Sequence, residues 1–335
     1  MTGETITLAR VPQNGSITIR TRGVELELPE LVATAGSRAA EASFEFFTAR
    51  IPNAHTRDAY GRAFHRFAAW CSAETPPLPL EGITPPAIAA YLAELEAAGM
   101  SVASIKLHLA ALRHWLDWLC QKGVLPVNPA ASVRGPKLVV REGKTPVLER
   151  EQARKLFDSI GDDLVGLRDK ALLGVMLFGF VRVSAVCKMR VKDFEDAGGD
   201  AWLVLHEKGG RERRIPCHHL ARDYVRVYLA AAGIEAGSKA PLFQTARGRT
   251  ALLTGNAMRR SDVLAMVKRR ANEAGLPSSI CNHSFRATGI TIHQENGGRL
   301  EDAQELAGHA DMRTTQLYNR KSRKVARAEV ERVQL

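Results

Sequence analysis

A short segment rich in glycine, proline and basic residues, VRGPKLVVREGKTPVL at residues 133–148, divides this 335-residue chain. It has no helical spacing of apolar residues, which is typical of a linker between folded domains, although a plain surface loop has the same composition. The stretches on either side are each long enough to bury a core of their own. We therefore predict two domains, residues 41–133 and residues 149–335, joined by a basic linker at residues 134–148.

The stretch before the linker is predicted to be a bundle of helices. Residues 56–71 place aromatic and apolar side chains at helical spacing. Thr84 can cap the start of a second helix that ends at Gly99. Ser101 then opens a third helix, which runs to about Lys122 with apolar residues along one side. Basic residues lie off that apolar stripe, where they face either solvent or a bound partner.

Residues 1–40 are predicted to form an N-terminal arm. Within the arm, TITLARV and SITIRTR alternate apolar and polar residues on either side of PQNG. This pattern is typical of a β-hairpin with Asn14-Gly15 at its turn. Such a hairpin is too short to be an independent domain.

The stretch after the linker is predicted to be mostly helical, with one hairpin. Ala201–His206 and Arg213–Cys217 are strand candidates, and the turn between them, EKGGRE, carries Lys208 and Arg211. Helices are expected at about 218–232, 256–274, 283–296 and 300–307, and around Thr314. The expected fold class is therefore mainly α: a two-domain clamp with an N-terminal helical bundle and a mixed α/β C-terminal domain that holds a small antiparallel β-hairpin or sheet.

The composition favours a polyanionic partner, because the net charge is +11 and the isoelectric point is about 9.7. We expect no membrane association, since no apolar run reaches the roughly 18 residues that span a bilayer. The N-terminus MTGETITLAR lacks the pattern of a secretory signal. The five cysteines are scattered, which favours free thiols and a cytoplasmic location. No phosphate-binding glycine motif is present, so no cofactor is expected.

Several residues of the C-terminal domain suit chemistry on a phosphodiester, whose transition state gathers negative charge on the non-bridging oxygens. Acidic residues are dispersed, so we predict no metal site and expect fixed cations instead. Arginine suits this task because its planar group donates two parallel hydrogen bonds to phosphate. Arg182 follows the apolar run ALLGVMLFGF, and His283 and Arg286 lie one helical turn apart in HSFR. The full set, in chain order, is Arg182, Lys208, His283, Arg286, His309 and Tyr318.

Each of these residues also has an ordinary structural explanation when it is taken alone. Arg182 could form a buried ion pair, Lys208 could be a turn lysine, and Tyr318 could be a packing aromatic on an amphipathic helix. The joint order, type and spacing of the six residues favour the chemical interpretation.

This order resembles the tyrosine recombinase (phage integrase) family of site-specific DNA recombinases. NHSFRATGIT resembles the family's H-x-L-R-H-[ST] helix, and AGHADMRTTQLYNR resembles its L-G-H-x-x-x-x-T-x-x-Y segment. EKGGRERRIPC resembles its lysine-bearing hairpin. The resemblance covers about residues 45–325 and implies that residues 41–133 are a DNA-binding domain and residues 149–335 a catalytic domain with a C-terminal tail. The candidate DNA contacts are Arg57, Arg62, Lys106, Arg113 and Arg211.

The chain departs from the family pattern around its first catalytic arginine. The family commonly has G-L-R there, whereas this chain has Phe180-Val181-Arg182 with the glycine at 179. An acidic residue commonly follows that arginine by three positions, where this chain has Ala185. Ala307 replaces the usual leucine before Gly-His. The residue that supports Arg182 is therefore not evident from the sequence.

The resemblance implies a role for each candidate. Tyr318 attacks the scissile phosphorus and forms a 3′-phosphotyrosine, Lys208 protonates the departing 5′-oxygen, and His283 assists proton transfer at the tyrosine. The non-bridging oxygens are held by Arg182, Arg286 and His309. One ester is exchanged for another, so the reaction needs neither ATP nor metal.

The implied partner is double-stranded DNA carrying specific recombination sites, bound by a homo-tetramer of a bacterial or mobile-element recombinase, with or without accessory proteins. Two other functions remain open. A type IB topoisomerase-like enzyme would share the chemistry but relax DNA without site preference. A catalytically decayed DNA-binding regulator would be consistent with Ala185 and the shifted Gly179.

Overall fold

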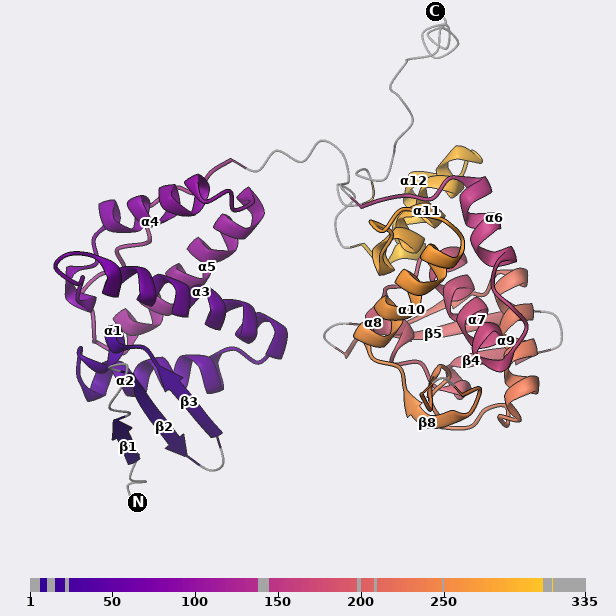
Figure 1. Cartoon of the computed structure of the whole chain (residues 1–335), viewed down its shortest axis with the longest axis horizontal. Coiled ribbons are helices and arrows are strands. Elements are labelled where there is room, and N and C mark those ends of the chain that lie inside the picture. The colour runs from indigo at the N-terminus through magenta and orange to yellow at the C-terminus, as the bar shows by residue number, and fades with distance from the viewer. Residues whose placement is uncertain are drawn as a thin grey trace, which may run out of the picture. The chain divides into compact units, whose positions relative to one another are not determined.

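The computed structural model describes residues 7–10, 16–21, 24–137, 145–197, 200–207, 210–248 and 250–309, together with Thr315. The chain forms two compact units, Met1–Val139 and Val140–Leu335 (Figure 1). The boundary between the units falls inside the segment that the sequence predicts to be a linker. The fold is mainly α with small antiparallel sheets, as predicted.

Helices form most of the N-terminal unit. Its main helices are α1 (Glu30–Ala33), α2 (Ser37–Glu45), α3 (Ala54–Ala73), α4 (Pro85–Ala97) and α5 (Val102–Gln121), with a π-helical turn at Phe46–Arg50 and a 3-10 turn at Leu80–Gly82. The predicted caps are present, because the side chain of Thr84 accepts from Ala87 N and that of Ser101 from Ser104 N. Helices α3 and α5 lie side by side (Figure 1) and bury Trp115, whose Nε1 donates to Ser43 Oγ over 3.0 Å.

A three-stranded antiparallel sheet precedes these helices. Its strands are β1 (Thr7–Arg10), β2 (Ile17–Thr21) and β3 (Val24–Leu28), in that order across the sheet. The predicted pairing of TITLARV with SITIRTR is observed, with Leu8 opposite Ile19, while its turn at Asn14-Gly15 lies outside the described residues. Ile19 and Leu28 are completely buried in the same core as α3 and α5. This packing goes beyond the arm that the sequence predicts, because apolar residues on one side of a short sheet need a helical surface to cover them.

Helices and two small sheets make up the C-terminal unit. The helices are α6 (Arg150–Asp158), α7 (Leu164–Phe178), α8 (Val183–Val186), α9 (His219–Ala232), α10 (Arg260–Glu273), α11 (Asn282–Glu295) and α12 (Leu300–Ala307), with a 3-10 turn at Val191–Asp193. The strands are β4 (Phe194–Ala197), β5 (Asp200–His206) and β6 (Glu212–Pro216) in one antiparallel sheet, and β7 (Gln244–Ala246) and β8 (Leu253–Ala257) in another. The predicted hairpin corresponds to β5 and β6. The helix predicted around Thr314 lies outside the described residues, apart from Thr315.

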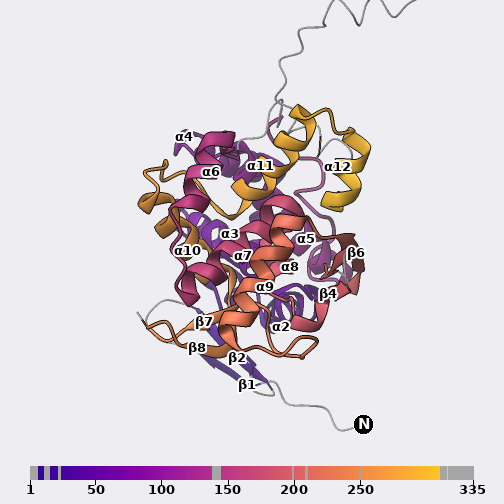
Figure 2. The ribbon, with the colours of Figure 1, turned by 90° about the vertical axis from the view of Figure 1, so that its right-hand side faces the viewer.

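Helix α7 forms the centre of this unit. From Ala171 to Leu177 its sequence is continuously apolar, and all seven of these residues are buried. Helix α9 lies beside it (Figure 2). Helix α11 also packs on α7 and holds the end of the predicted linker, since Leu148 N donates to Thr288 Oγ1 over 2.9 Å. The helix that carries HSFR is thereby fixed to the core of the unit.

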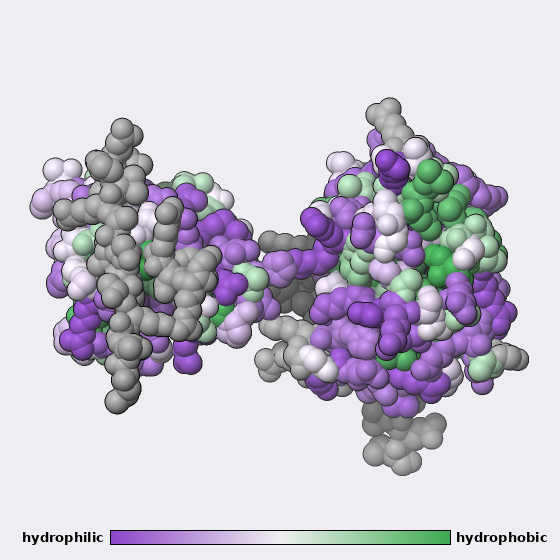
Figure 3. Space-filling view, turned by 90° about the horizontal axis from the view of Figure 1, so that it is seen from below, coloured by the Kyte–Doolittle hydropathy of each residue, from purple (hydrophilic) through white to green (hydrophobic). Residues whose placement is uncertain are grey.

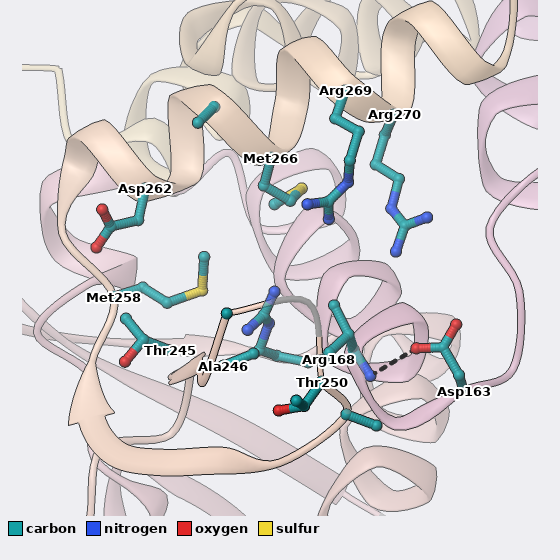
Figure 4. A pocket seen from close by; sticks show the side chains of 14 residues that line it. Asp163, Arg168, Thr245, Ala246, Thr250, Met258, Asp262, Met266, Arg269 and Arg270 are labelled. Carbon is teal, nitrogen blue, oxygen red and sulfur yellow. Dashed lines mark hydrogen bonds between the residues drawn. The ribbon is translucent and has the colours of Figure 1, made fainter.

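A buried carboxylate ties α10 to α7. Asp169 is completely buried and accepts from Arg168 Nη2 at 2.6 Å, from Arg269 Nη2 at 2.9 Å and from Arg270 Nε at 2.9 Å. These arginines border a cavity of about 820 Å³ between α7, α10 and the β7–β8 hairpin (Figure 4). A buried charge is costly unless it is paired, so this network fixes the position of α10, the helix that leads into α11.

Figure 3 shows mainly hydrophilic residues on the visible face of each unit, with hydrophobic residues gathered in one area of the C-terminal unit. In the described ranges, no helix combines the length and the apolar character that crossing a bilayer requires. All five cysteines are free thiols.

Candidate active site

Four of the six predicted catalytic residues come together in the C-terminal unit. Arg182 stands at the start of α8, His283 and Arg286 lie on the first turns of α11, and His309 follows α12. Arg182 Nη2 donates to Gly308 O over 3.2 Å, and Arg286 Nη2 donates to the adjacent Ala307 O over 2.6 Å. Segments more than 100 residues apart therefore meet at one place. The remaining two predicted residues, Lys208 and Tyr318, lie outside the described residues.

Arg286 lies at the bottom of this cluster and is only 2% exposed. Besides Ala307 O, its guanidinium donates to Phe180 O, so it joins the segment before Arg182 to the end of α12. The approach of α11 to α7 depends on Gly289, where an added Cβ would overlap the carbonyl oxygen of Leu177. The glycine in RATGIT thus lets Arg286 reach into the space between the elements.

The backbone of Phe180 is strained. Its φ is +51°, a left-handed conformation that costs a non-glycine residue about 1–2 kcal/mol. Phe180 is 4% exposed and packs with Ile290, Ala303 and Ala307, contacts that offset the cost. The family pattern has glycine at position 180, whereas this chain has its glycine at 179. A Cβ at residue 179 would lie 2.9 Å from Val175 O.

A carboxylate supports Arg182 from the neighbouring hairpin. Glu207 Oε1 accepts from Arg182 Nη1 at 3.1 Å and from Arg213 Nη2 at 3.2 Å. Arg213 also donates to the carbonyls of Glu305, at 3.2 Å, and Leu306, at 2.8 Å, at the end of α12. Neither Glu207 nor Arg213 was identified from the sequence.

One sequence signal for these two residues is the density of charge in EKGGRERR. Alternation along β6 decides which arginine points toward the cluster. Arg213 is directed inward with a side chain 19% exposed. Arg214 is directed outward, where it pairs with Glu195 at 2.8 Å and its guanidinium lies over the ring of Trp202. Arg211, which the sequence suggested as a DNA contact, is exposed at the tip of the hairpin.

His309 is buried beside three arginines. Burial lowers the pKa of its imidazole to about 4, with further lowering by the positive charges of Arg286, Arg182 and Arg213. Its Nδ1 lies 2.8 Å from Thr315 Oγ1, a partner that the sequence did not identify. The ring is therefore neutral at pH 7, and when Nδ1 accepts from Thr315, Nε2 carries the hydrogen that can be donated.

His283 is also held in its neutral form. Partial burial lowers the pKa of its imidazole, and the charges of Arg286 and Arg182 lower it further. A neutral imidazole can accept a proton, which is the property needed beside an attacking hydroxyl. The site therefore combines guanidinium cations with two imidazoles that are not themselves charged.

A cavity of about 360 Å³ opens next to this cluster. Residues of the hairpin and of the α12 end line it, among them Glu207, Arg211, Arg213 and His309. The described residues that line the larger cavity of Figure 4 include none of the predicted catalytic residues. Among the residues whose positions are described, no group of three or more His, Cys, Asp or Glu side chains could hold a metal ion.

The predicted DNA contacts of the N-terminal unit differ in their surroundings. Arg62 and Lys106 are exposed on α3 and α5. Arg57 Nη1 donates to Ile51 O at 3.2 Å. Arg113 donates to Ala130 O at 3.1 Å and also to Val133 O, so it anchors the chain that follows α5. That structural role was not expected, and DNA contact by these four residues stays a prediction.

Comparison with known protein families gives two matches. Residues 146–324 match the phage integrase family, and residues 47–123 match the phage integrase N-terminal SAM-like domain. Tyrosine recombinase XerC of Xylella fastidiosa strain M23 is 30% identical over 284 residues, which cover 84% of this chain and 92% of that protein. Tyrosine recombinase XerC of Yersinia pestis is 33% identical over 224 residues, covering 66% of this chain and 69% of that protein.

Solved structures with a similar fold come from proteins of the same kind. XerH site-specific recombinase bound to palindromic difH substrate matches with a TM-score of 0.66 and 18% identity, covering 91% of this chain and 86% of that one. A lambda integrase dimer bound to a COC′ core site matches with a TM-score of 0.63 and 19% identity, covering 86% and 96%. At these identities the likeness establishes the fold.

Proposed function

The chain belongs to the phage integrase family and is a site-specific DNA recombinase, and we propose that the cluster around Arg182 and Arg286 is its catalytic centre. The observation that carries this proposal is the convergence of the two guanidinium groups on adjacent carbonyls, next to two imidazoles whose pKa values they lower. The neutral imidazoles leave the arginines as the charges that meet the phosphate.

In this proposal, the phenolic oxygen of Tyr318 forms a bond to the scissile phosphorus while the bond from phosphorus to the 5′-oxygen breaks. His283 accepts the phenolic proton, and Lys208 donates a proton to the departing 5′-oxygen. The non-bridging oxygens accept hydrogen bonds from Arg182, Arg286 and His309 Nε2. A 5′-hydroxyl from a second duplex then attacks the phosphotyrosine and reverses each of these steps.

The charges of the described part of the site suit this reaction. Arg182, Arg213 and Arg286 contribute three positive charges and Glu207 one negative charge, while both imidazoles are held neutral. The net charge of these six groups is therefore +2. The transition state of phosphodiester exchange carries about two negative charges on phosphorus-bound oxygens, so a net positive charge here stabilises it more than the singly charged ground state.

The chemistry of strand exchange bears on the oligomeric state. Two duplexes must each be cut on both strands, and each cut uses one tyrosine, so we propose a homo-tetramer on DNA. Arg57, Arg62, Lys106, Arg113 and Arg211 are proposed to contact the DNA. We further propose cytoplasmic action on a bacterial chromosome or mobile element, with no resident cofactor.

A nicked duplex that loses its 5′ fragment after cleavage tests the catalytic proposal, because religation is then blocked. The site sequence is obtained first, by sequencing genomic DNA that remains covalently attached to the denatured protein. The wild-type chain should form an adduct that is stable in detergent, and Tyr318→Phe should form none. An adduct that persists in Tyr318→Phe, or its absence from the wild type, would exclude this tyrosine chemistry.

The topoisomerase alternative is distinguished by a second substrate. Two plasmid-borne copies of the recovered site should yield recombinant joints, whereas a supercoiled plasmid without the site should not be relaxed. Efficient relaxation of the plasmid without the site, and no joint formation, would favour the topoisomerase.

A further inference from the structure

We propose that Glu207 is the positioning residue that orients Arg182 toward the scissile phosphate, a role that no acidic residue near Arg182 in the sequence can fill. The inference rests on the proposed catalytic centre. Arg182 lies in a loop with a side chain 35% exposed, so a partner is needed to hold its guanidinium in one orientation. One helical turn later the chain has Ala185, which is 2% exposed and carries no polar atom on its side chain.

Glu207 has the geometry for this task. Its side chain is 16% exposed, and Oε1 lies 3.1 Å from Arg182 Nη1. The other amino nitrogen of Arg182, Nη2, donates to Gly308 O, so two acceptors on different elements fix the plane of the guanidinium. Two fixed acceptors restrict the rotation of an arginine far more than one, because the planar group must satisfy both at once.

Glu207 is itself held in place. Its backbone N–H donates to Arg211 O over 2.8 Å, which closes the hairpin directly at this residue. The same Oε1 accepts from Arg213 Nη2 at 3.2 Å, and Arg213 is anchored to the carbonyls of Glu305 and Leu306. The carboxylate therefore links the Arg182 loop, the hairpin and the end of α12.

Two further observations support a role for Glu207 in the site. Gly308 has a φ of +60°, and a Cβ there would lie 3.0 Å from Glu207 Oε2, so glycine leaves room for the carboxylate. Glu207 also directly precedes Lys208, the proposed general acid. A displacement of Glu207 would therefore change the orientation of Arg182.

The competing interpretation is that the carboxylate imitates a phosphate and blocks Arg182 until DNA arrives. The two interpretations predict opposite changes in the cleavage rate when the carboxylate is removed. A positioning carboxylate speeds cleavage, so its loss slows the reaction, whereas a blocking carboxylate slows cleavage, so its loss accelerates the reaction.

The test uses full-length protein at saturating concentration and the nicked duplex of recovered sequence, and it measures the single-turnover rate of adduct formation. Glu207→Gln keeps the size of the side chain and removes its charge. We expect adduct formation about 10- to 100-fold slower, because a small misorientation of a catalytic cation has effects of this size. DNA affinity should change by less than about threefold, since many other phosphate contacts maintain binding.

Glu195→Gln, in a surface ion pair with Arg214 on the same sheet, is the matched control and should react as the wild type does.

A rescue experiment separates positioning from general damage. Ala185→Glu places a carboxylate one turn from Arg182. The double variant Ala185→Glu, Glu207→Gln should form the adduct at least about tenfold faster than Glu207→Gln alone. Wild-type or faster cleavage by Glu207→Gln would overturn the proposal, as would a folded double variant no faster than Glu207→Gln. If the wild type forms no adduct, the proposed function fails and this inference falls with it. If only the variants deviate from expectation, the proposed function stands and this inference alone fails.

Discussion

The carbonyl oxygen of Phe180 accepts a hydrogen bond from the guanidinium of Arg286. This bond fixes the strained backbone of Phe180 and the buried side chain of Arg286 relative to each other. Arg182 follows this left-handed residue by two positions. Arg286 in turn stays 2% exposed because its donors have fixed carbonyl partners.

Glycine should be tolerated better than alanine at position 180. Both substitutions remove a buried ring, which costs about 3–5 kcal/mol, but only glycine relaxes the positive φ, by about 1 kcal/mol. Phe180→Gly should therefore be more stable than Phe180→Ala, as measured by denaturant unfolding. Phe157 in α6, buried in the same unit, is the control, and there glycine should be the worse replacement. If the glycine and alanine variants had the same order of stability at positions 180 and 157, backbone strain at Phe180 would be excluded.

Gly289→Ala should strongly destabilise the C-terminal unit. The new methyl group would overlap Leu177 O and contact the ring of Phe180, so α11 must move away from α7. We expect a loss of about 2–4 kcal/mol in the free energy of unfolding. Gly61→Ala in α3 has no atom within 4 Å of the added Cβ and should be neutral or stabilising by up to about 1 kcal/mol. Equal effects at the two glycines would refute the close approach of α11.

Stability should depend on pH through His309. The folded state holds the pKa of this imidazole at about 4, below its ordinary value of 6.5, so between these values the unfolded chain binds the extra proton. The free energy of unfolding should therefore rise as pH increases from 4 to 6.5 and then level off, with a contribution of up to about 3 kcal/mol. Unfolding of wild type and His309→Asn at several pH values measures this. A variant curve parallel to that of the wild type over this range would rule the contribution out.

Arg62 and Arg113 should respond differently to replacement by alanine. Arg62 is exposed, so its loss should leave stability unchanged, weaken DNA binding, and reduce the salt dependence of binding by about one unit of slope. Arg113 holds the carbonyls of Ala130 and Val133, so its loss should destabilise the N-terminal unit by about 1–3 kcal/mol. Binding titrations at several salt concentrations, paired with unfolding of each variant, check both. A destabilised Arg62→Ala with an unchanged salt slope would exclude its contact with phosphate.

Much of the site and fold could be predicted from the sequence, because local patterns depend on local physics. Helical periodicity and the caps at Thr84 and Ser101 follow from backbone hydrogen bonding within a few residues. The pair His283 and Arg286 shares one side of a helix because three residues make nearly one turn. The alternation in residues 201–217 likewise predicted a hairpin, which β5 and β6 form.

Only the tertiary structure decided which distant groups meet. Nothing near Arg182 in the sequence indicates Glu207, which lies 25 residues away and reaches it because the hairpin folds back beside α8. The inward direction of Arg213, the left-handed backbone of Phe180 and the packing of Ile19 and Leu28 on the helices depend on contacts between elements. The order of the proposed catalytic residues is therefore read directly from the sequence, whereas the charges and orientations of the four described ones depend on long-range packing, which no local pattern encodes.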